Sequence, residues 1–331
     1  MRALLSHEPG PPETLQLCEV PEPAAGPGEL LIRVRACAIN YPDVLIIEDK
    51  YQFRPTRPFA PGGEVAGEVE EVGEGVEGWE VGDRLIAYHG HGGLAEKVAV
   101  PAAHAFPLPR QFDFVAGSTL LITYATVIHA LWDRGRLKEG ETLLVLGAAG
   151  GIGIAAIELG KAKGARIIAA VSSEEKARAA REAGADEAIV YPRGPFDKDG
   201  QRALAEQFKA AVGPNGADVI LDPVGGDYAE PALRAIGWEG RYLVVGFPAG
   251  IPRLPLNLTL LKSCDVCGVF WGAFAARDPK ANAAHVAELF RLWEDGKISP
   301  NVSATYPLER AGDAIAAMAN RQAIGKLVVT L

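Results

Sequence analysis

Hydrophobic and polar residues follow two different patterns along the chain, and the pattern changes near residue 120. Before that point, runs such as ELLIRVRACAI (29–39), EVAGEVEEVG (64–73) and DRLIAY (83–88) alternate between apolar and polar positions, as half-buried strands do, with Pro- and Gly-rich turns between them. These runs predict a twisted, mostly antiparallel β unit. The glutamates of the second run are expected on its solvent face.

After residue 120, short apolar runs alternate with helical patterns. Residues 142–171 predict a strand, a Gly-rich turn, a helix and a second strand. Apolar strands that alternate with helices form parallel βαβ units, so we expect an α/β fold with a doubly wound Rossmann sheet. Further helices are expected at 173–183, about 200–212, about 227–236 and about 279–295, and further strands at 187–191, 217–222, 241–247, 265–272 and 326–331.

Composition and charge narrow the classes of partner. The 331 residues suffice for two domains, and 48% hydrophobic with 23% charged residues is ordinary globular composition. The net charge of −9 disfavours a nucleic-acid or anionic-membrane partner, since either selects for a basic face. No apolar run reaches the ~18 residues of a membrane span, and the N-terminus lacks a signal-peptide pattern. We therefore expect a cytoplasmic protein, and its four cysteines are too few for a disulfide scaffold.

The stretch GAAGGIG (147–153) follows an expected strand and opens an expected helix, which is the context of a dinucleotide-binding turn. The first glycine would end the strand, the middle pair would let the backbone approach a pyrophosphate, and the last would let the helix pack closely. The helix N-terminus adds free N–H groups and a positive dipole end. A tight turn without a ligand is the alternative. The predicted contacts are Gly147, Ala148, Gly150, Gly151, Ile152 and Gly153.

The tip of the second strand, IIAAVSS (167–173), indicates which dinucleotide binds. NAD-binding sites usually carry Asp or Glu there to hold the ribose 2′-OH, but this tip has no acid. Ser172, Ser173 and Lys176 offer hydroxyls and a cation to a 2′-phosphate, and Tyr191 at the end of the third strand could also reach it. The pattern favours NADPH over NADH. The alternative is that these are cap and loop residues, since Ser172 has capping-box spacing to an acid three residues later.

The order of these motifs resembles that of the medium-chain dehydrogenase/reductase superfamily over the whole chain. It is most similar to the zinc-free NADPH:quinone oxidoreductases, the zeta-crystallin-like branch. So many motifs in one order are specific for the superfamily. The matching stretches are NYPD (40–43), PGGEVAGEVEEVGEGVEGWEVGDRL (61–85), GGLAEKVAVP (92–101), TYATVIHAL (123–131), GAAGGIG (147–153), VSSEEK (171–176), DPVGG (222–226) and GKLVV (325–329).

The resemblance implies a GroES-like catalytic domain, formed by residues 1–119 and 271–331, and a Rossmann NADPH-binding domain formed by residues 120–270. It implies a cleft between them that holds nicotinamide and substrate. The implied acceptor is a small molecule: a quinone, an α,β-unsaturated carbonyl compound or an enoyl thioester. Further cofactor contacts are implied at Gly246, Phe247, Phe270, Arg321 and Lys326.

Zinc-dependent members of the superfamily bind their catalytic metal through a Cys at the position of Asn40 and a His at the position of Gly63. In those members the His is followed by a Glu, and of this pair only the Glu is present here, as Glu64. One carboxylate cannot supply the four or so ligands that zinc needs. The histidines of YHGHGG (88–93) have no further Cys or His close in sequence, and the cysteines of CDVC (264–267) have no second pair. We therefore expect no metal.

A metal-free site must position the acceptor and donate hydrogen bonds to the oxyanion that develops on it. Asn40, at the position of the metal ligand, could donate through its amide. Tyr51 has the spacing at which enoyl-reductase relatives carry a proton-donating tyrosine, and a phenol of pKa ~10 arrives protonated at neutral pH. Thr123 could bond the nicotinamide amide. Each has a structural alternative, since Asn40 could satisfy a turn, Tyr51 pack on prolines and Thr123 cap a helix.

The leading hypothesis is an NADPH-dependent, metal-free reductase of quinones or activated alkenes. A zinc alcohol dehydrogenase is disfavoured by the missing ligands. An NADPH-binding protein with a structural or regulatory role and little turnover stays open, because it would keep the same cofactor turn. The apolar strand expected at 265–272 lies at a sheet edge in this interpretation, so we also expect a homodimer.

Overall fold

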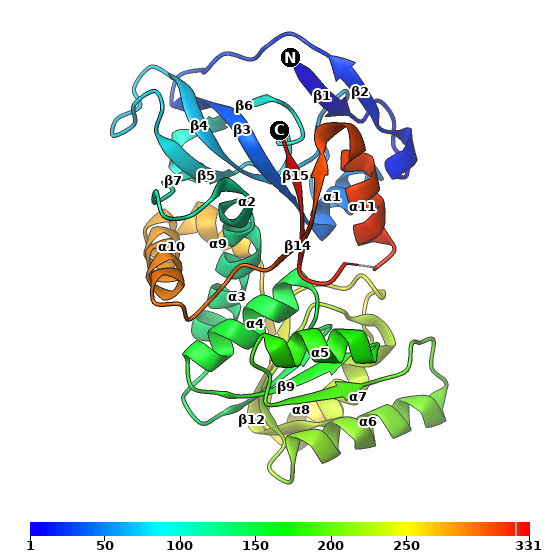
Figure 1. Cartoon of the computed structure of the whole chain (residues 1–331). Helices are drawn as coiled ribbons and strands as arrows, with labels where there is room; N and C mark the ends of the chain where they lie inside the picture. Colours follow the sequence, from blue (N-terminus) through cyan, green and yellow to red (C-terminus); the bar gives the residue numbers. More distant parts are fainter. Residues whose placement is uncertain (322) are drawn as a thin grey trace. The chain divides into compact units, whose positions relative to one another are not determined.

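A computed structural model of the protein describes residues 1–321 and 323–331. Contacts along the chain divide it into two compact units. The first unit consists of Met1–Ile122 and Pro300–Leu331, and the second unit consists of Thr123–Ser299. Figure 1 labels the helices and strands of each unit.

The second unit begins at Thr123, close to the expected limit of 120, but it ends at Ser299, well beyond the expected limit of 270. Helices α9 (Trp271–Arg277) and α10 (Pro279–Glu294) belong to the second unit, and the chain returns to the first only at Pro300. Side-chain contacts explain this assignment. The indole Nε1 of Trp271 donates to Asn282 Oδ1 at 2.9 Å and joins α9 to α10. Phe274 of α9 stacks on His129 with ring centroids 4.1 Å apart.

The first unit is built on one sheet. In its described part, which omits residue 322, seven strands pair in the order β14-β15-β3-β4-β5-β7, with β6 paired to β3. β14 and β15 are parallel, whereas the other pairs are antiparallel, as the alternating runs predicted. The strands are β3 (Glu29–Ile39), β4 (Glu64–Val72), β5 (Arg84–Tyr88), β6 (Lys97–Pro101), β7 (Ala105–Pro107), β14 (Val302–Pro307) and β15 (Lys326–Thr330), and β1 (Arg2–Leu5) pairs separately with β2 (Gln16–Glu19).

Strand β3 is the central element of the first unit, because it pairs with β4, β6 and β15. Its alternate residues Leu30, Ile32 and Val34 enter the hydrophobic core. The approach of β4 to β3 requires glycine at position 67, since a Cβ there would lie 2.1 Å from the carbonyl oxygen of Arg33. Two short helices, α1 (Tyr41–Ile47) and α11 (Ala311–Ala319), contribute further residues to this core.

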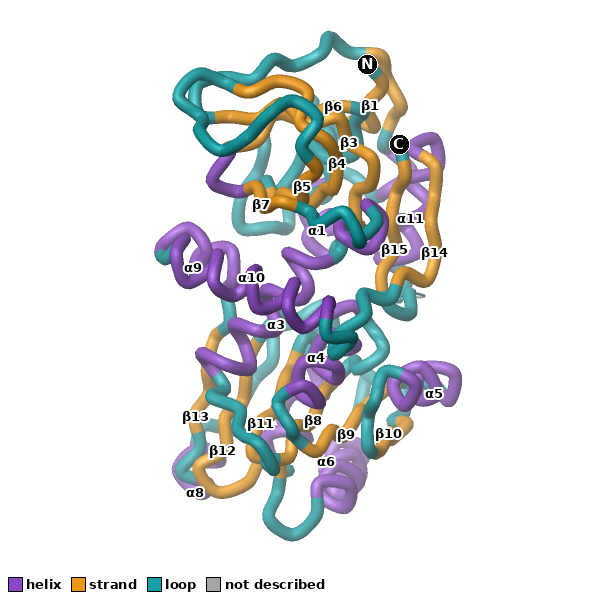
Figure 2. The backbone as a smooth tube through the Cα atoms, turned by 60° about the vertical axis from the view of Figure 1, so that its left-hand side comes forward, coloured by secondary structure: helices purple, strands orange, loops and turns teal. Residues whose placement is uncertain are grey.

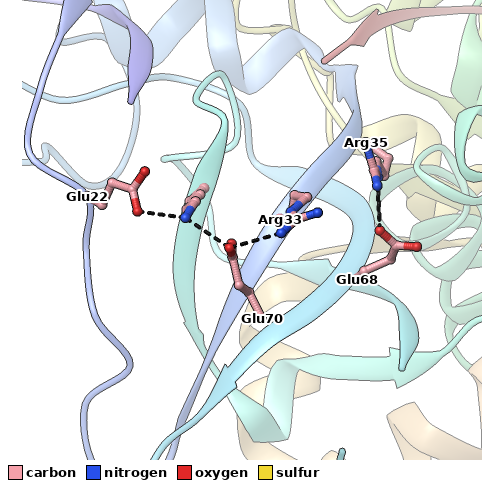
Figure 3. Close-up of polar contacts among 6 residues, drawn as sticks. Glu22, Arg33, Arg35, Glu68 and Glu70 are labelled. Carbon is pink, nitrogen blue, oxygen red and sulfur yellow. Dashed lines mark hydrogen bonds and ion pairs between the residues drawn. The ribbon is translucent and has the colours of Figure 1, made fainter. Parts of the chain in front are cut away.

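The solvent face of β3, β4 and β6 carries the glutamates expected there. Figure 3 shows Glu68 beside Arg35 and Glu70 beside Arg33. Their closest nitrogen–oxygen distances are 2.7 Å and 3.1 Å. Lys97 bridges Glu70 and Glu22 at 3.0 Å and 2.6 Å. These contacts are cross-strand ion pairs on a partly exposed surface, where each contributes roughly 0–1 kcal/mol.

The second unit is a doubly wound α/β domain. Within 123–299, all of which the structure describes, six parallel strands pair in the order β10-β9-β8-β11-β12-β13. Figure 2 shows these strands side by side. Numbered from β8, the order is 3-2-1-4-5-6, that of a Rossmann sheet, and it confirms the predicted fold class. The strands are β8 (Thr142–Leu146), β9 (Arg166–Val171), β10 (Glu187–Val190), β11 (Ala217–Asp222), β12 (Ile236–Val244) and β13 (Asp265–Gly268).

Helices connect these strands. Besides α9 and α10, the second unit contains α3 (Thr126–Ile128), α4 (Gly151–Ala162), α5 (Glu174–Glu182), α6 (Lys198–Val212), α7 (Ala229–Arg234) and α8 (Asn257–Lys262).

One expected element differs in length. The strand predicted over 265–272 ends at Gly268, and Phe270 becomes the N-cap of α9. Its apolar residues thus divide between an edge strand and a helix, which sequence hydrophobicity cannot distinguish.

A helical segment covers Phe114–Arg134 and includes α2 (Phe114–Gly117) and α3. Among the described residues it alone is long and apolar enough, by length and composition, to cross a membrane. However, 72% of its most apolar stretch is buried within the protein, as in a core helix. The sequence analysis did not single out this segment as a possible membrane span, because Ser118, Thr119 and His129 interrupt its apolar run.

Candidate functional site

Three strand ends of the first unit bring polar residues together at one edge of its sheet. Asn40 directly follows β3, Glu64 is the first residue of β4, and Lys326 is the first residue of β15. Antiparallel pairing places Ala38 opposite Glu64 and Ile39 opposite Leu327. The end of β3 therefore lies between the beginnings of β4 and β15. We call Asn40, Asp43, Glu64 and Lys326 the polar cluster.

The polar cluster is joined by direct contacts. Lys326 Nζ donates to Asn40 Oδ1 at 2.5 Å and lies 3.5 Å from Glu64 Oε1. Asn40 Nδ2 donates to the carbonyl oxygen of Ala38 at 3.3 Å. Asp43 anchors the turn, because its two oxygens accept from the backbone N–H groups of Asn40 and Gly62 at 2.7 Å and 2.9 Å. Asn40 is therefore held on both sides of its amide, and it is also the N-cap of α1.

All four side chains of the polar cluster are buried. Burial raises the pKa of Asp43 to about 6, against the opposing hydrogen bonds from Asn40 and Gly62. Burial also raises the pKa of Glu64, and the neighbouring charge of Lys326 is the largest influence that lowers it. A carboxylate and an ammonium group that are both removed from water need each other as partners. The cluster is thus a buried positive charge held by an amide and a carboxylate.

Gly63 lies beside Ile122 and Gly90. A Cβ at this position would be 3.2 Å from Ile122 Cδ1 and 3.5 Å from the carbonyl oxygen of Gly90. A side chain at position 63 would therefore require a small shift of the Ile122 side chain. Across residues 1–321 and 323–331, no group of three or more His, Cys, Asp or Glu side chains is arranged to hold a metal ion.

Tyr51 lies in an aromatic group of the first unit. Its ring meets Phe53 edge-on with centroids 5.2 Å apart, and Phe53 and Phe59 both contact the ring of His91. His89 lies edge-on to His91 at 5.2 Å. Burial and the nearby charge of Asp43 raise the pKa of Tyr51. Its phenol therefore carries its proton at neutral pH, as a proton donor requires.

Thr123 is buried in the helical segment Leu120–Ala125. The preceding residue is held by the polar cluster, since the backbone N–H of Ile122 donates to Glu64 Oε2 at 2.5 Å. Glu64 therefore links two features of the first unit that are 58 residues apart in sequence. The sequence placed Asn40, Glu64 and Lys326 in three separate motifs and gave no sign that they touch.

The turn between β8 and α4 has the geometry that the sequence predicted. Gly147 has a positive φ of 58°, a conformation that favours glycine, and Gly150 is the N-cap of α4. A Cβ on Gly153 would lie 2.5 Å from the backbone of Ala148, so only glycine lets the helix pack here. Gly151 and Ile152, the first residues of α4, are partly exposed. These features fit a pyrophosphate at the helix N-terminus.

The tip of β9 differs from the expected cap. Ser173, and not Ser172, is the N-cap of α5, and its Oγ accepts from the backbone N–H of Lys176 at 3.3 Å. A hydroxyl that accepts in this way keeps its own proton for a phosphate oxygen. Ser172 and Lys176 are partly exposed beside it. Tyr191 is buried, however, and its ring packs against Phe208 and Tyr228.

The remaining predicted contacts of the second unit follow the ends of β12 and β13. Gly246 and Phe247 come after β12, and Phe270 comes after β13. Phe247 and Phe270 are 46% and 57% exposed, so both rings are available to a ligand. Parallel strands end at one edge of a sheet, which places these residues at the same edge as the Gly147–Gly153 turn. In the first unit, Arg321 has a positive φ of 57° after α11.

Two carboxyl groups of the second unit were missed by the sequence reasoning. Asp222, at the end of β11, is buried and accepts from Tyr242 Oη at 2.6 Å and from the N–H groups of Val224 and Gly225, each at 2.8 Å. It therefore fixes the DPVGG turn. Glu158 lies in the middle of α4, and a lone acid among the apolar residues of that helix was the available signal.

The two units thus offer complementary chemistry. The second unit provides the turn, helix N-terminus and hydroxyl-rich strand tip that suit a phosphorylated dinucleotide. The first unit provides a buried cation, an amide and a protonated phenol, which suit an acceptor that gains negative charge.

Comparison with known proteins identifies related chains. Residues 26–110 match the alcohol dehydrogenase GroES-like domain family, and residues 151–288 match the zinc-binding dehydrogenase family. Quinone oxidoreductase-like protein 2 of Bos taurus is 34% identical over 92% of this chain and 86% of that protein. The quinone oxidoreductase of Rattus norvegicus is 32% identical over 95% of this chain and 92% of that protein.

Solved structures give the same relationship. The crystal structure of Escherichia coli quinone oxidoreductase complexed with NADPH has a TM-score of 0.91, with 28% identity over 100% of both chains. These matches confirm the superfamily that the sequence motifs indicated. This chain belongs to the quinone oxidoreductase-like branch of the medium-chain dehydrogenase/reductase superfamily.

Proposed function

We propose that this protein is an NADPH-dependent oxidoreductase that transfers hydride, without a metal, to a quinone or an α,β-unsaturated carbonyl acceptor. The observation that carries the proposal is the contact of Lys326 Nζ with Asn40 Oδ1 and Glu64 Oε1. Asn40 and Gly63 stand where zinc-dependent members of the superfamily have metal ligands. A fixed ammonium charge beside them replaces the metal's charge and opposes the entry of another cation.

The cofactor assignment rests on the second unit. The Gly147–Gly153 turn would hold the pyrophosphate, and Ser172, Ser173 and Lys176 would hold the 2′-phosphate, since no acid at the tip of β9 repels it. Two relatives by structure are described as complexes with NADPH, which supports this choice. When bound, NADPH supplies the hydride.

The first unit would stabilise the acceptor. The amide oxygen of Asn40 accepts from Lys326, and its amide N–H groups donate to Ala38 and Glu64. Its role is therefore to hold Lys326 and Glu64 in place, and not to donate to the acceptor. Tyr51 is the better proton donor because burial keeps its phenol protonated. Its hydroxyl would donate to the oxyanion and then transfer a proton to the reduced product.

The first prediction concerns turnover. We expect NADPH oxidation with at least one member of a panel that contains a quinone, an enone and an enoyl thioester, followed by NADPH absorbance. A protein that binds NADPH tightly but oxidises it with none of the three would instead have the structural or regulatory role that the sequence left open.

The variant Tyr51→Phe refines this prediction, because it removes the hydroxyl and keeps the ring. Loss of one oxyanion donor typically lowers kcat by ~10²–10³. We expect that loss with an enone and a smaller one with a quinone, whose reduced form delocalises charge and takes protons from water. Single-turnover hydride transfer should be measured, since slow product release can hide the effect. Wild-type rates with both acceptors would make Tyr51 a packing residue.

The second prediction concerns cofactor preference. Lys176→Ala should raise the KM for NADPH on the order of tenfold, since one charged hydrogen bond contributes roughly 1.5–3 kcal/mol, and it should leave the KM for NADH nearly unchanged. The exposed residue Lys198 on α6 gives a matched control, Lys198→Ala, for the loss of one surface charge. Equal changes for both cofactors would contradict the assignment of Lys176.

The third prediction tests the ammonium group in place of a metal. Elemental analysis of the purified protein should find far less than one zinc per chain, and a chelator should leave activity intact. Lys326→Met should lower activity and also stability, by about 3–5 kcal/mol, because it leaves Glu64 as an unpaired buried charge.

A double variant separates these two effects. Lys326→Met combined with Glu64→Gln removes both charges, so we expect most of the lost stability to return in thermal unfolding while activity stays low. Recovery of activity in the double variant would show that Lys326 acts only as a structural partner of Glu64.

The fourth prediction concerns assembly. β13 is the last strand in the sheet of the second unit, and Val266 on it is 41% exposed. We propose that a second copy of the chain pairs with this edge and forms a homodimer, since an unpaired strand edge favours association. Light scattering should give twice the chain mass of 35.0 kDa. Val266→Lys should give monomers, whereas Val81→Lys, at an exposed position of the first unit, should not.

A further inference from the structure

Glu158 makes an unusual set of contacts in the second unit. It lies in the middle of α4, where the surrounding helix residues from Gly153 to Gly160 are otherwise buried. Its Oε2 accepts two hydrogen bonds, one from Tyr124 Oη at 2.7 Å and one from the backbone N–H of Ser299 at 3.1 Å. Tyr124 is only 2% exposed. A single carboxyl oxygen therefore joins three segments that are distant in sequence.

Both partners of Glu158 lie where the chain passes between the units. Thr123 is the first residue of the second unit and Ser299 is its last. Tyr124 follows Thr123 directly, and Ser299 binds the same oxygen through its own backbone. Glu158 thus ties both junctions of the second unit to α4, the helix that begins at the dinucleotide turn.

Few other charges face this carboxyl group. Of the elements that pack most closely on α4, α3 and β8 contain no ionisable side chain, and the Arg166 of β9 pairs with Glu187 at 3.3 Å. The helical segment continues beyond α3 to His129 and Asp133, which pair with each other at 2.7 Å. On α4 itself, Lys161 pairs with Asp186 at 2.9 Å. Lys297, two residues before Ser299, is exposed. The groups that act on Glu158 are therefore its two hydrogen-bond donors and its own burial.

We propose that Glu158 is a positioning residue that holds both junctions of the second unit to α4, and that loss of its proton weakens this hold. The inference does not depend on the proposed reductase activity. It predicts that the segment carrying Thr123 and the segment ending at Ser299 loosen together as pH rises.

The direction of the effect follows from proton linkage. Burial raises the pKa of Glu158 from 4.5 to about 7 in the held arrangement, while the hydrogen bonds from Tyr124 and Ser299 oppose this. Glu158 is partly exposed in the held arrangement. When the junctions open and its carboxyl group becomes fully exposed to water, its pKa returns toward the ordinary value. The held arrangement therefore binds the proton more tightly, and it loses stability relative to the open one between about pH 4.5 and pH 7. Above about pH 7 no further change is expected.

Hydrogen exchange of the whole protein tests this directly. The Ser299 amide donates to Glu158, so its protection reports on the contact. After correction for the intrinsic pH dependence of exchange, protection of the Ser299 amide and of peptides covering 120–125 should fall between pH 5 and pH 7.5, on the order of tenfold or more, and then level off. Protection that does not vary with pH in the wild type would overturn the proposal.

Two variants and one control make the test specific. Glu158→Gln keeps an oxygen acceptor but cannot titrate, so its protection should not depend on pH. Tyr124→Phe removes a hydrogen bond that lowers the pKa of Glu158. The pH above which protection stops falling should therefore be higher in this variant. Glu182→Gln, at an exposed position of α5, should behave as the wild type. The same pH-dependent fall in Glu158→Gln as in the wild type would also overturn the proposal.

Discussion

A buried ammonium group must have partners, and this requirement organises the first unit. Lys326 is 3% exposed, and its Nζ finds Asn40 and Glu64. Neither partner is near it in sequence, so the contact exists only when β15 returns to the edge of β3 and β4 begins on the other side. The last strand of the chain is therefore needed for the electrostatics of residues near its beginning. Asp43, which fixes the turn after Asn40, completes the arrangement.

The second unit is subject to a different constraint: the backbone of its turns must be able to approach the phosphates of a ligand closely. Its parallel strands end at one edge of the sheet, where Gly147 directly follows β8 and Ser172 directly follows β9. Gly153 permits α4 to pack on the turn that it follows, and Asp222 fixes the neighbouring DPVGG turn. Rigid turns of this kind let a sheet edge present backbone N–H groups to phosphates without reorganisation.

The helical segment that carries Thr123 begins in the first unit and continues into the second. Glu64 accepts from the backbone of Ile122, and Glu158 accepts from the hydroxyl of Tyr124. The residues on either side of Thr123 are therefore each held by a carboxyl group whose pKa burial has raised. Burial disfavours the charged form of both carboxyl groups, and each group in turn fixes the position of a neighbouring segment through its hydrogen bonds.

The sequence by itself determined the fold class, the strand–turn–helix context of Gly147–Gly153 and most element positions, because hydrophobic periodicity and glycine geometry are local properties. It also placed Asn40 and Lys326 in a functional region through their motifs. Only the tertiary structure decided that these two residues touch and that Ser173 caps α5. It also assigned α9 and α10 to the second unit and buried Tyr191 among aromatic rings. These outcomes depend on which distant strands become neighbours and on how deeply each charge is removed from water, and neither quantity is encoded in any single stretch of sequence.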